Sequence, residues 1–269
     1  MVESGIEETL PERLKGFSEI VAPVALVTAH PDDETLGLGS RLGCFRDLRL
    51  ILLTDGAPRD LVDTRRLGLA DWPAYAALRE GELAAALALL GADWAQRRRY
   101  EIPDKESIIH LATIVARLVE DLADRAAVVT HCYEHGHPDH DTAALAVHLA
   151  CRRLRREGRP APAHFEFASY HLEGGSLAVG RFRAMPGAPE TVLALGPEDE
   201  ARKRAAVQCF ASQLWLIGRF PLSPERIRPA PAYDFAEAPG PAFYDRLGWD
   251  ITAAGWRELA KAALDDPAM

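Results

Sequence analysis

The chain has 269 residues, of which 48% are hydrophobic and 26% charged, and this composition is that of an ordinary soluble globular protein. Its formal net charge of −9 argues against nucleic acid and against an anionic membrane surface as binding partners, so we expect a small-molecule substrate. The length predicts one large domain over residues 1–269.

The first segment, Met1–Ile20, is acidic and amphipathic, without the basic start and apolar middle of a secretory signal. No later stretch is apolar for long enough to span a bilayer. We therefore expect a cytoplasmic protein without a transmembrane segment. The four cysteines include no Cys-x-x-Cys pair, so reduced thiols are expected rather than a disulfide framework or a thiolate zinc cage.

Apolar runs rich in β-branched residues alternate with segments of helical period through much of the chain. In chain order, strands are predicted at residues 24–28, 48–54, 100–102, 126–131 and 164–169. Helices are predicted at residues 35–45, in an Ala/Leu-rich stretch that ends near Gly91, and at 107–122, 142–156, 197–209 and 252–264. This alternation predicts an α/β fold with a mostly parallel sheet and crossover helices.

The pattern changes after residue 169. Residues 177–184 and 191–195 are predicted to pair as a hairpin. The stretch Pro221–Pro241 is rich in proline and has no clear periodicity. We expect this last stretch to be a loop or a lid over a binding site.

A histidine and three carboxylates follow the first predicted strand, in the sequence Ala29-His30-Pro31-Asp32-Asp33-Glu34. Pro31 stops strand pairing, so the carboxylates fall in the turn before the next helix. One alternative is that Asp32 or Asp33 only caps that helix, because aspartate accepts backbone N–H bonds at this position. The adjacent histidine favours the other alternative, a cluster of metal ligands.

A second cluster, His137-Pro138-Asp139-His140-Asp141, follows the strand predicted at 126–131. Pro138 suits the first turn of a helix, where His137 and His140 are three residues apart and face the same way. Ligands of a parallel sheet bind outside the carboxyl ends of its strands, so both clusters are expected at one edge. Two or three imidazoles with several carboxylates suit a borderline divalent metal that keeps a water, and we interpret the clusters as one hydrolytic metal site.

These two motifs resemble the signatures of the PIG-L/LmbE-like N-acetylglucosaminyl deacetylases. The resemblance continues in Leu53-Thr54-Asp55-Gly56, in Arg79-Glu80-Gly81-Glu82-Leu83, in Leu90-Gly91, at Lys203 and in Ser212-Gln213. It covers most of residues 20–215, which would form the core, with 216–269 as a C-terminal extension. The implied fold is a Rossmann-like α/β domain with helices on both faces of the sheet and a C-terminal hairpin/helix extension. The implied activity is zinc-dependent hydrolysis of the N-acetyl amide of an amino sugar or its glycoside, which releases acetate and a free amine.

The resemblance also implies roles for residues, carried over position by position. The implied metal ligands are His30, Asp33 and His140. Asp32 would be the general base of the hydrolysis. A protonated His137, oriented by Asp139, would stabilise the oxyanion.

The resemblance implies two further positions at the substrate, and the chain departs from the family pattern at a third. Arg79 matches an arginine that lies near sugar hydroxyls, and Asp104 falls in a loosely aligned segment that holds a substrate-contacting acid. This chain has His135-Gly136 where relatives commonly have Gly-Gly. For His135 three roles stay open: narrowing the cleft, contacting the substrate, or lying in solvent. Glu34 is expected to cap the helix or to support the ligands.

Two other functions stay open from the residues alone. Two histidines and one carboxylate also bind ferrous iron in oxygenases, so Fe²⁺ or another divalent metal is an alternative to Zn²⁺. A non-catalytic sugar-binding protein could keep the same fold, although a base and a donor beside an open metal position argue against it. The oligomeric state has no signal in the sequence, and a homo-oligomer stays open.

Overall fold

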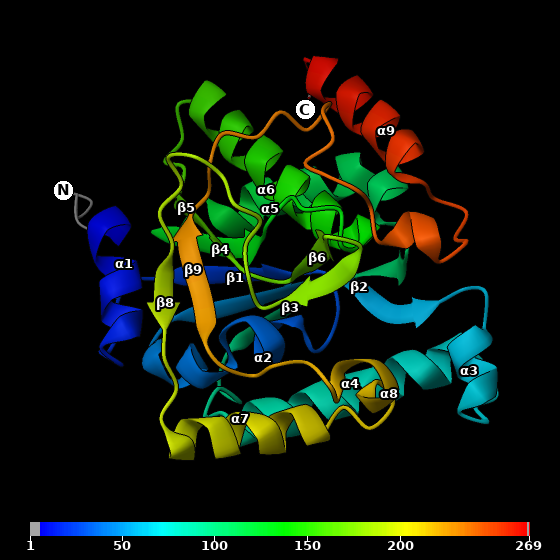
Figure 1. Ribbon diagram of the computed structural model, residues 1–269. Coiled ribbons are helices and arrows are strands. Elements are labelled where there is room, and N and C mark those ends of the chain that lie inside the picture. The colour runs from blue at the N-terminus through cyan, green and yellow to red at the C-terminus, as the bar shows by residue number, and fades with distance from the viewer. Residues whose placement is uncertain (1–5, 268) are drawn as a thin grey trace.

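A seven-stranded sheet lies between two layers of helices in the computed structural model, which describes residues 6–267 and 269 (Figure 1). The first five residues of the segment predicted at Met1–Ile20 therefore lie outside the described residues. The strand order is β3-β2-β1-β4-β5-β9-β8. Five of these strands are parallel and follow the predicted ones: β1 (Val24–Thr28), β2 (Leu48–Pro58), β3 (Gln96–Asp104), β4 (Ala127–His131) and β5 (Ala163–Phe167).

The strand order creates a switch point beside β1. The chain moves outward from β1 to β2 and β3, and then returns to place β4 on the other side of β1. Loops that leave the carboxyl ends of β1 and β4 therefore diverge to opposite sides and leave room between them, which is where ligands bind in open α/β sheets.

Helices cover both faces of the sheet, as predicted (Figure 1). Side chains alternate along β1, so that Val24 and Leu26 pack on one face while Ala25 and Val27 pack on the other. The first face is covered by α1 (Ile6–Lys15), α2 (Asp33–Leu38), the 3-10 helix η1 (Gly39–Cys44), α4 (Trp72–Leu89) and α7 (Pro197–Gln208). The second is covered by α5 (Leu111–Leu122), α6 (Pro138–Arg156) and α9 (Ala253–Asp265). Both layers are held by apolar burial, the main favourable term in folding.

Several helix boundaries follow from local chemistry. The side chain of Asp71 accepts the backbone N–H of Ala74 at 2.9 Å and begins α4, with Pro73 in its first turn. The short helices α3 (Val62–Arg66) and α8 (Leu214–Ile217) and the 3-10 helices η2 (Ser107–His110) and η3 (Tyr244–Arg246) lie between the main elements. The helix predicted at 35–45 is α2 followed by η1, since its second half is tightened into a 3-10 helix.

The predicted hairpin between 177–184 and 191–195 is wrong. Strand β7 (Ser176–Val179) pairs with β6 (Tyr170–Glu173), whereas β8 (Thr191–Leu193) pairs with β9 (Glu225–Pro229). Strand β9 also pairs antiparallel with β5, so the stretch predicted as a loop or lid at 221–241 contributes a strand to the central sheet. This strand was hidden because two of its buried side chains, Glu225 and Arg228, are charged.

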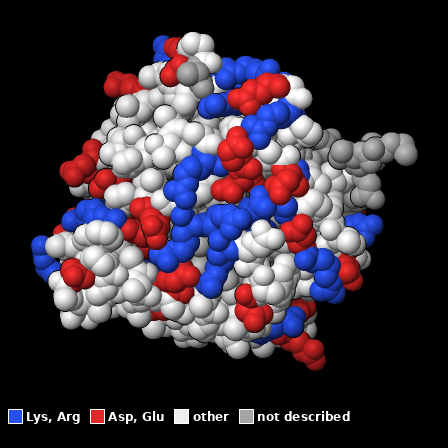
Figure 2. Space-filling model, turned by 180° about the vertical axis from the view of Figure 1, so that it is seen from behind, with Lys and Arg blue, Asp and Glu red and all other residues white. Residues whose placement is uncertain are grey.

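Charged side chains protect one edge of the sheet. The face turned away in Figure 1 carries a band of lysines and arginines with acidic side chains among them (Figure 2). On the edge strand β3, Arg97 and Arg99 pair with Glu80, at 2.8 and 3.6 Å. Charges on an edge strand discourage pairing with another sheet edge. No helix in residues 6–267 and 269 combines the length and the hydropathy that a bilayer span requires.

Candidate metal centre

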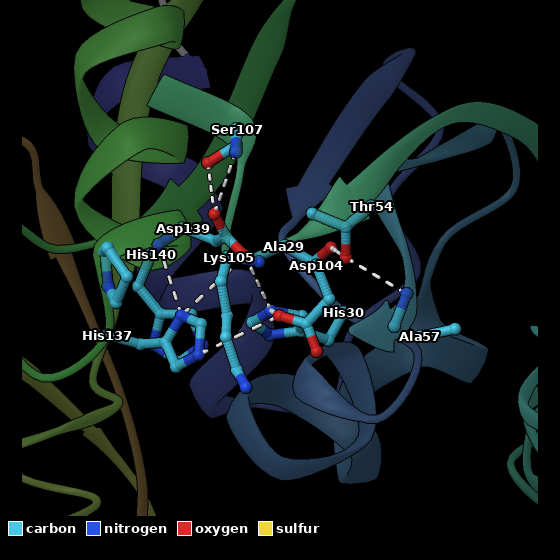
Figure 3. Close-up of polar contacts among 12 residues, drawn as sticks. Ala29, His30, Thr54, Ala57, Asp104, Lys105, Ser107, His137, Asp139 and His140 are labelled. Atoms are coloured by element: carbon cyan, nitrogen blue, oxygen red, sulfur yellow. Dashed lines mark hydrogen bonds and ion pairs between the residues drawn. The ribbon is translucent and has the colours of Figure 1, made fainter. Parts of the chain in front are cut away.

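The two clusters, about a hundred residues apart in sequence, meet at the carboxyl ends of β1 and β4 (Figure 3). The first cluster fills the turn from β1 into α2, and the second fills the first turn of α6, directly beyond β4. The predicted convergence at one edge of the sheet is therefore present in the structure.

Asp33 lies between two imidazoles. Its Oδ2 is 3.3 Å from Nδ1 of His30, and its Oδ1 is 3.2 Å from Nε2 of His140. All three side chains are buried. Two ligand atoms held about 2.1 Å from one tetrahedral ion lie about 3.4 Å apart, so these separations suit a shared divalent ion.

Within the described residues, three overlapping groups of side chains have ligand atoms within 4.8 Å of one another. They are His30, His137 and His140; His30, Asp104, His137 and Asp139; and Asp33, His131 and His140. Neutral imidazoles with carboxylates are the donors that zinc and similar divalent ions take. The residues present thus fit a metal ion. His30, His137 and His140 each belong to two of the groups, whereas Asp33 is grouped with His140 but not with His30.

Asp32 has an unusual backbone conformation and an unusual proton affinity. Its φ of 142° lies in the region that side-chain-bearing residues rarely adopt. The alternative that Asp32 only caps α2 is wrong, because within the described part of the chain its carboxylate makes no capping bond to that helix. Burial raises the pKa of Asp32 to about 8, against the opposing charge of Arg79. Glu34 supports the turn instead, by accepting the backbone N–H of Asp32 at 3.1 Å.

Arg79 is directed at Asp32 rather than at open space. Its guanidinium lies 3.0 Å from Oδ2 of Asp32 and donates to the carbonyls of Pro31 at 2.6 Å and Gly56 at 3.2 Å. Only 3% of Arg79 is exposed. Arg79 therefore contacts the neighbouring carboxylate, and the expected contact with the sugar stays a prediction.

His137 is held by a backbone group. Its Nδ1 accepts the N–H of Asp139 at 3.2 Å, which leaves the ring proton on Nε2. Burial, with His30 and His140 close by, lowers the pKa of His137 well below its usual value. The lowered pKa favours a neutral ring that can donate from Nε2, and the protonated His137 expected from the resemblance stays a prediction.

The carboxylate of Asp139 faces His30 instead of His137. Its Oδ2 is 3.2 Å from Nε2 of His30 but 3.9 Å from Nδ1 of His137. The backbone N–H of Lys105 at 2.7 Å and both the N–H and the hydroxyl of Ser107 donate to it (Figure 3). Asp139 therefore orients His137 through its backbone, and its side chain fixes His30.

Asp104 lies within the histidine cluster, and its expected contact with the substrate stays a prediction. Its Oδ1 is 3.1 Å from Nε2 of His30 and 4.0 Å from Nε2 of His137. Burial opposes a charged His30, but Asp104, Asp139 and Asp33 together raise the pKa of His30 well above its usual value. The surplus of carboxylates around one imidazole is an environment suited to a cation.

His135 neither lines a cleft nor lies in solvent. It is fully buried, and its Nδ1 is 2.8 Å from Oδ2 of Asp141. Its Nε2 is 3.1 Å from the guanidinium of Arg257, and its backbone carbonyl accepts the N–H of Phe243 at 2.8 Å. The expected substrate contact is wrong, because His135 instead anchors the C-terminal part of the chain.

Three residues of the site were not predicted. His131, at the end of β4, lies 3.2 Å from Oδ2 of Asp33 and stacks on His140 with ring centroids 3.9 Å apart. His131 is the last residue of the strand predicted at 126–131, at the same edge of the sheet. This position could have indicated that His131 belongs to the site. Tyr170 packs against His140 at 5.2 Å and Trp249 against His137 at 4.9 Å. Both come from segments with no readable period, so no signal marked them.

The family model and the curated relatives that match this chain have related deacetylase descriptions. Residues 25–151 match the family model described as PIG-L, GlcNAc-PI de-N-acetylase. A 1D-myo-inositol 2-acetamido-2-deoxy-alpha-D-glucopyranoside deacetylase of Corynebacterium jeikeium (strain K411) is 27% identical over 264 residues, covering 74% of this chain and 79% of the relative. A protein of the same description from Mycobacterium sp. (strain KMS) is 29% identical over 149 residues, covering 46% and 48%.

Solved structures share the fold. The A40926 pseudoaglycone deacetylase Dbv21 has a TM-score of 0.56 and 19% identity, covering 78% of this chain and 97% of that one. The zinc-inhibited form of the teicoplanin deacetylase Orf2 has a TM-score of 0.56 and 16% identity, covering 79% and 99%. The 4-carboxy-2-hydroxymuconate hydratase GalB of Pseudomonas putida KT2440 has a TM-score of 0.52 and 17% identity, covering 78% and 97%. One fold thus carries two kinds of reaction, and the side chains of the site must distinguish them.

Proposed function

We propose that the chain is a metal-dependent deacetylase of the PIG-L family that hydrolyses the N-acetyl amide of an amino sugar or its glycoside, a proposal supported by the match of residues 25–151 to the family model and by the similarity to the Corynebacterium jeikeium relative. The observation that carries the proposal is the position of Asp33, whose two oxygens lie 3.3 and 3.2 Å from His30 and His140. Asp32 and His137 stand beside this group, where a base and a donor are needed.

His30, Asp33 and His140 would hold the ion, with Asp33 3.3 Å from His30 and 3.2 Å from His140, and we propose Zn²⁺ because two imidazoles and a carboxylate are a common zinc ligand set. When bound, such an ion polarises the amide carbonyl and lowers the pKa of the attacking water. His131, which lies against both Asp33 and His140, would keep these two ligands in place.

Asp32 would take the proton of the attacking water. Burial raises the pKa of this carboxyl group, so its ionised form holds a proton more tightly than an exposed carboxylate does, and the same proton can then pass to the departing amine. The contact with Arg79 fixes the carboxylate, so the proton transfer needs no search through side-chain rotamers.

His137 would donate its Nε2–H to the oxyanion. A neutral donor that is already oriented stabilises negative charge as it develops, and loss of such a donor typically costs about 10²–10³ in rate. Asp104, near Nε2 of both His137 and His30, would face the substrate side of the site.

The proposal is tested with zinc-reconstituted protein and a panel of N-acetylated amino sugars, including N-acetylglucosamine and its inositol and nucleotide glycosides. We expect equal amounts of acetate and free amine from at least one member. Release of neither from any member, with one equivalent of metal bound, would contradict the proposal. Oxygen consumption would point to the Fe²⁺ oxygenase alternative.

The role of Asp32 is tested by Asp32→Asn. This variant should keep its metal content, because Asp32 is not among the grouped ligands, and should lose most of its amidase activity. The control is Asp93→Asn, which changes an exposed carboxylate outside the site and should match the wild type. Wild-type activity in Asp32→Asn would rule out the role.

The ligand assignment is tested by His140→Ala. Metal content and activity should fall together in this variant, as measured by elemental analysis and amine release. His148→Ala is the matched control. His148 lies on the same helix, eight residues after His140, and this variant should retain the metal. Full metal occupancy in His140→Ala would show that the ligands are assigned wrongly.

A further inference from the structure

A small apolar pocket opens beside Asp33, on the side of the site away from His137. Its lining includes Leu36 from α2, Phe167 from the end of β5, Val179 from β7, and Phe220 and Pro221 from the segment before β9. The cavity volume is about 20 Å³. A volume of this size admits one water-sized group, and a methyl group is of similar size.

The two sides of the histidine cluster differ in polarity. His137 faces Asp104, Lys105 and Trp249, a side with charged groups that suits sugar hydroxyls. His140 faces the other side, where its Nδ1 is 3.2 Å from the hydroxyl of Ser169 and its ring packs on Tyr170. Ser169 and Tyr170 both line the apolar pocket. An amide bound between the two sides would therefore place its acyl group in the pocket and its sugar toward Lys105.

We propose that this pocket binds the methyl group of the acetyl substituent and restricts the enzyme to short acyl groups, with Phe220 as the residue that sets the limit. The inference rests on the proposed deacetylase function and specifies its substrate. Phe220 lines the pocket and packs on Tyr170 with ring centroids 5.8 Å apart. Two other lining residues, Gly37 and Phe167, pack so closely that a Cβ on Gly37 would come within 2.3 Å of the ring of Phe167.

Much of the pocket wall lies outside the part of the chain that matches the family model. Val179, Phe220 and Pro221 lie outside residues 25–151, the part that matches the family model. The ligand cluster is inside that part, whereas four of the eleven lining residues come from the hairpin β6–β7 and from the segment before β9. Relatives that share the metal ligands can thus differ in acyl specificity.

The experiment compares the N-formyl, N-acetyl and N-butanoyl forms of glucosamine, or of whichever amino sugar the panel identifies, by amine release. Wild-type protein should prefer acetyl over butanoyl by at least about 10² in kcat/KM, since each methylene that does not fit costs about 10–200-fold. Phe220→Ala should reduce this preference at least tenfold by accepting the butanoyl form. Val179→Phe should fill the pocket, with a loss of acetyl turnover and retention of formyl turnover.

Phe243→Ala is the matched control. Phe243 also packs on Tyr170, at 6.1 Å, but does not line the pocket, so its removal should leave the acyl preference unchanged. Equal turnover of acetyl and butanoyl by the wild type, or an unchanged preference in Phe220→Ala, would overturn the inference. No turnover of any acyl form by the wild type would instead count against the proposed deacetylase function.

A binding measurement keeps the inference testable without turnover. In calorimetric titrations of zinc-loaded protein, acetate should bind the wild type, while butanoate should bind only Phe220→Ala. Butanoate binding to the wild type as tightly as acetate would show that the pocket sets no limit on acyl size. Metal content, measured in the same samples, should be equal in all variants because none changes a grouped ligand.

Discussion

Asp32 shows how a single residue is prepared for chemistry by its surroundings. Its carboxylate is buried, and its backbone is held at a φ of 142° by the turn from β1 into α2. Such a conformation costs of order 1–3 kcal/mol and persists only where neighbouring contacts fix it. Arg79 supplies those contacts by binding Asp32 and two backbone carbonyls at once.

Arg79→Lys should therefore lower kcat with little change in metal content. The guanidinium of Arg79 donates hydrogen bonds to Asp32, Pro31 and Gly56 at once, and a lysine ammonium cannot reproduce this geometry. The carboxylate of Asp32, the proposed general base, would therefore be displaced. Displacement of a reacting group by about 1 Å can cost about 10² in rate. The measurement is steady-state kinetics on the best substrate, with Arg117→Lys as a control on a surface helix. A raised KM with unchanged kcat would instead support the sugar contact expected from the sequence.

The motif residues could be predicted because their chemistry is local. His30, Asp33 and His140 follow strands at short distance, and the edge of a parallel sheet brings such positions together. The environment of His135 could not be predicted, since its partners Phe243 and Arg257 lie more than a hundred residues further along the chain. The spacing of residues in the sequence identifies side chains of a suitable chemical type. The burial of a side chain and its contact partners depend on the three-dimensional fold.

At the scale of elements, β9 is held in the sheet by a buried ion pair. Nζ of Lys203 on α7 lies 2.8 Å from Oε1 of Glu225 and donates to the carbonyl of Leu36 at 2.7 Å. Ser40 donates to the same carboxylate from its backbone, at 2.8 Å, and its hydroxyl, at 2.6 Å. These bonds connect α7, α2, η1 and β9, and they explain how a strand with charged residues can lie in the interior.

Lys203→Met should lower the free energy of unfolding by about 3–5 kcal/mol, because it leaves the buried Glu225 carboxylate without its charge partner. The double variant Lys203→Met/Glu225→Gln should recover part of this loss. Urea unfolding followed by circular dichroism measures both. Arg204→Met removes an exposed ion pair with Glu200 on the same helix and should cost no more than about 0.5 kcal/mol. A loss in Lys203→Met no larger than in this control would contradict the argument.

Strands with a local sequence signal were predicted correctly, whereas the pairing of strands that depends on distant parts of the chain was not. Strand β1 is found at the predicted residues 24–28, since an apolar run buried on both faces carries its own signal. The partners of β7 and β8 were assigned wrongly because strand pairing is a long-range property: β8 is completed by β9, which lies more than thirty residues further on. Local pattern predicts the existence of strands better than it predicts their neighbours.

For the whole molecule, the C-terminal segment is part of the same packing unit as the core. Trp256 on α9 is fully buried, donates from Nε1 to the hydroxyl of Thr142 at 3.0 Å, and stacks on Tyr133 with ring centroids 5.3 Å apart. Tyr244 reaches Asp141 at 3.2 Å, next to His140. The single domain over residues 1–269 stays a prediction, as do the cytoplasmic location and a homo-oligomer, but this packing gives the first of them a direct test.

Trp256→Ala should lower the stability of the entire chain. Loss of a fully buried tryptophan costs about 3–5 kcal/mol, and in a single cooperative unit that loss shifts the whole unfolding transition. Circular dichroism and tryptophan fluorescence in urea should give coincident transitions for the wild type and, at lower urea, for the variant. Trp215→Ala removes a tryptophan that is 58% exposed and should stay within about 1 kcal/mol of the wild type. Two separate transitions in Trp256→Ala would show that α9 unfolds on its own, and that the segment following β9 is a separate unit docked on the deacetylase core.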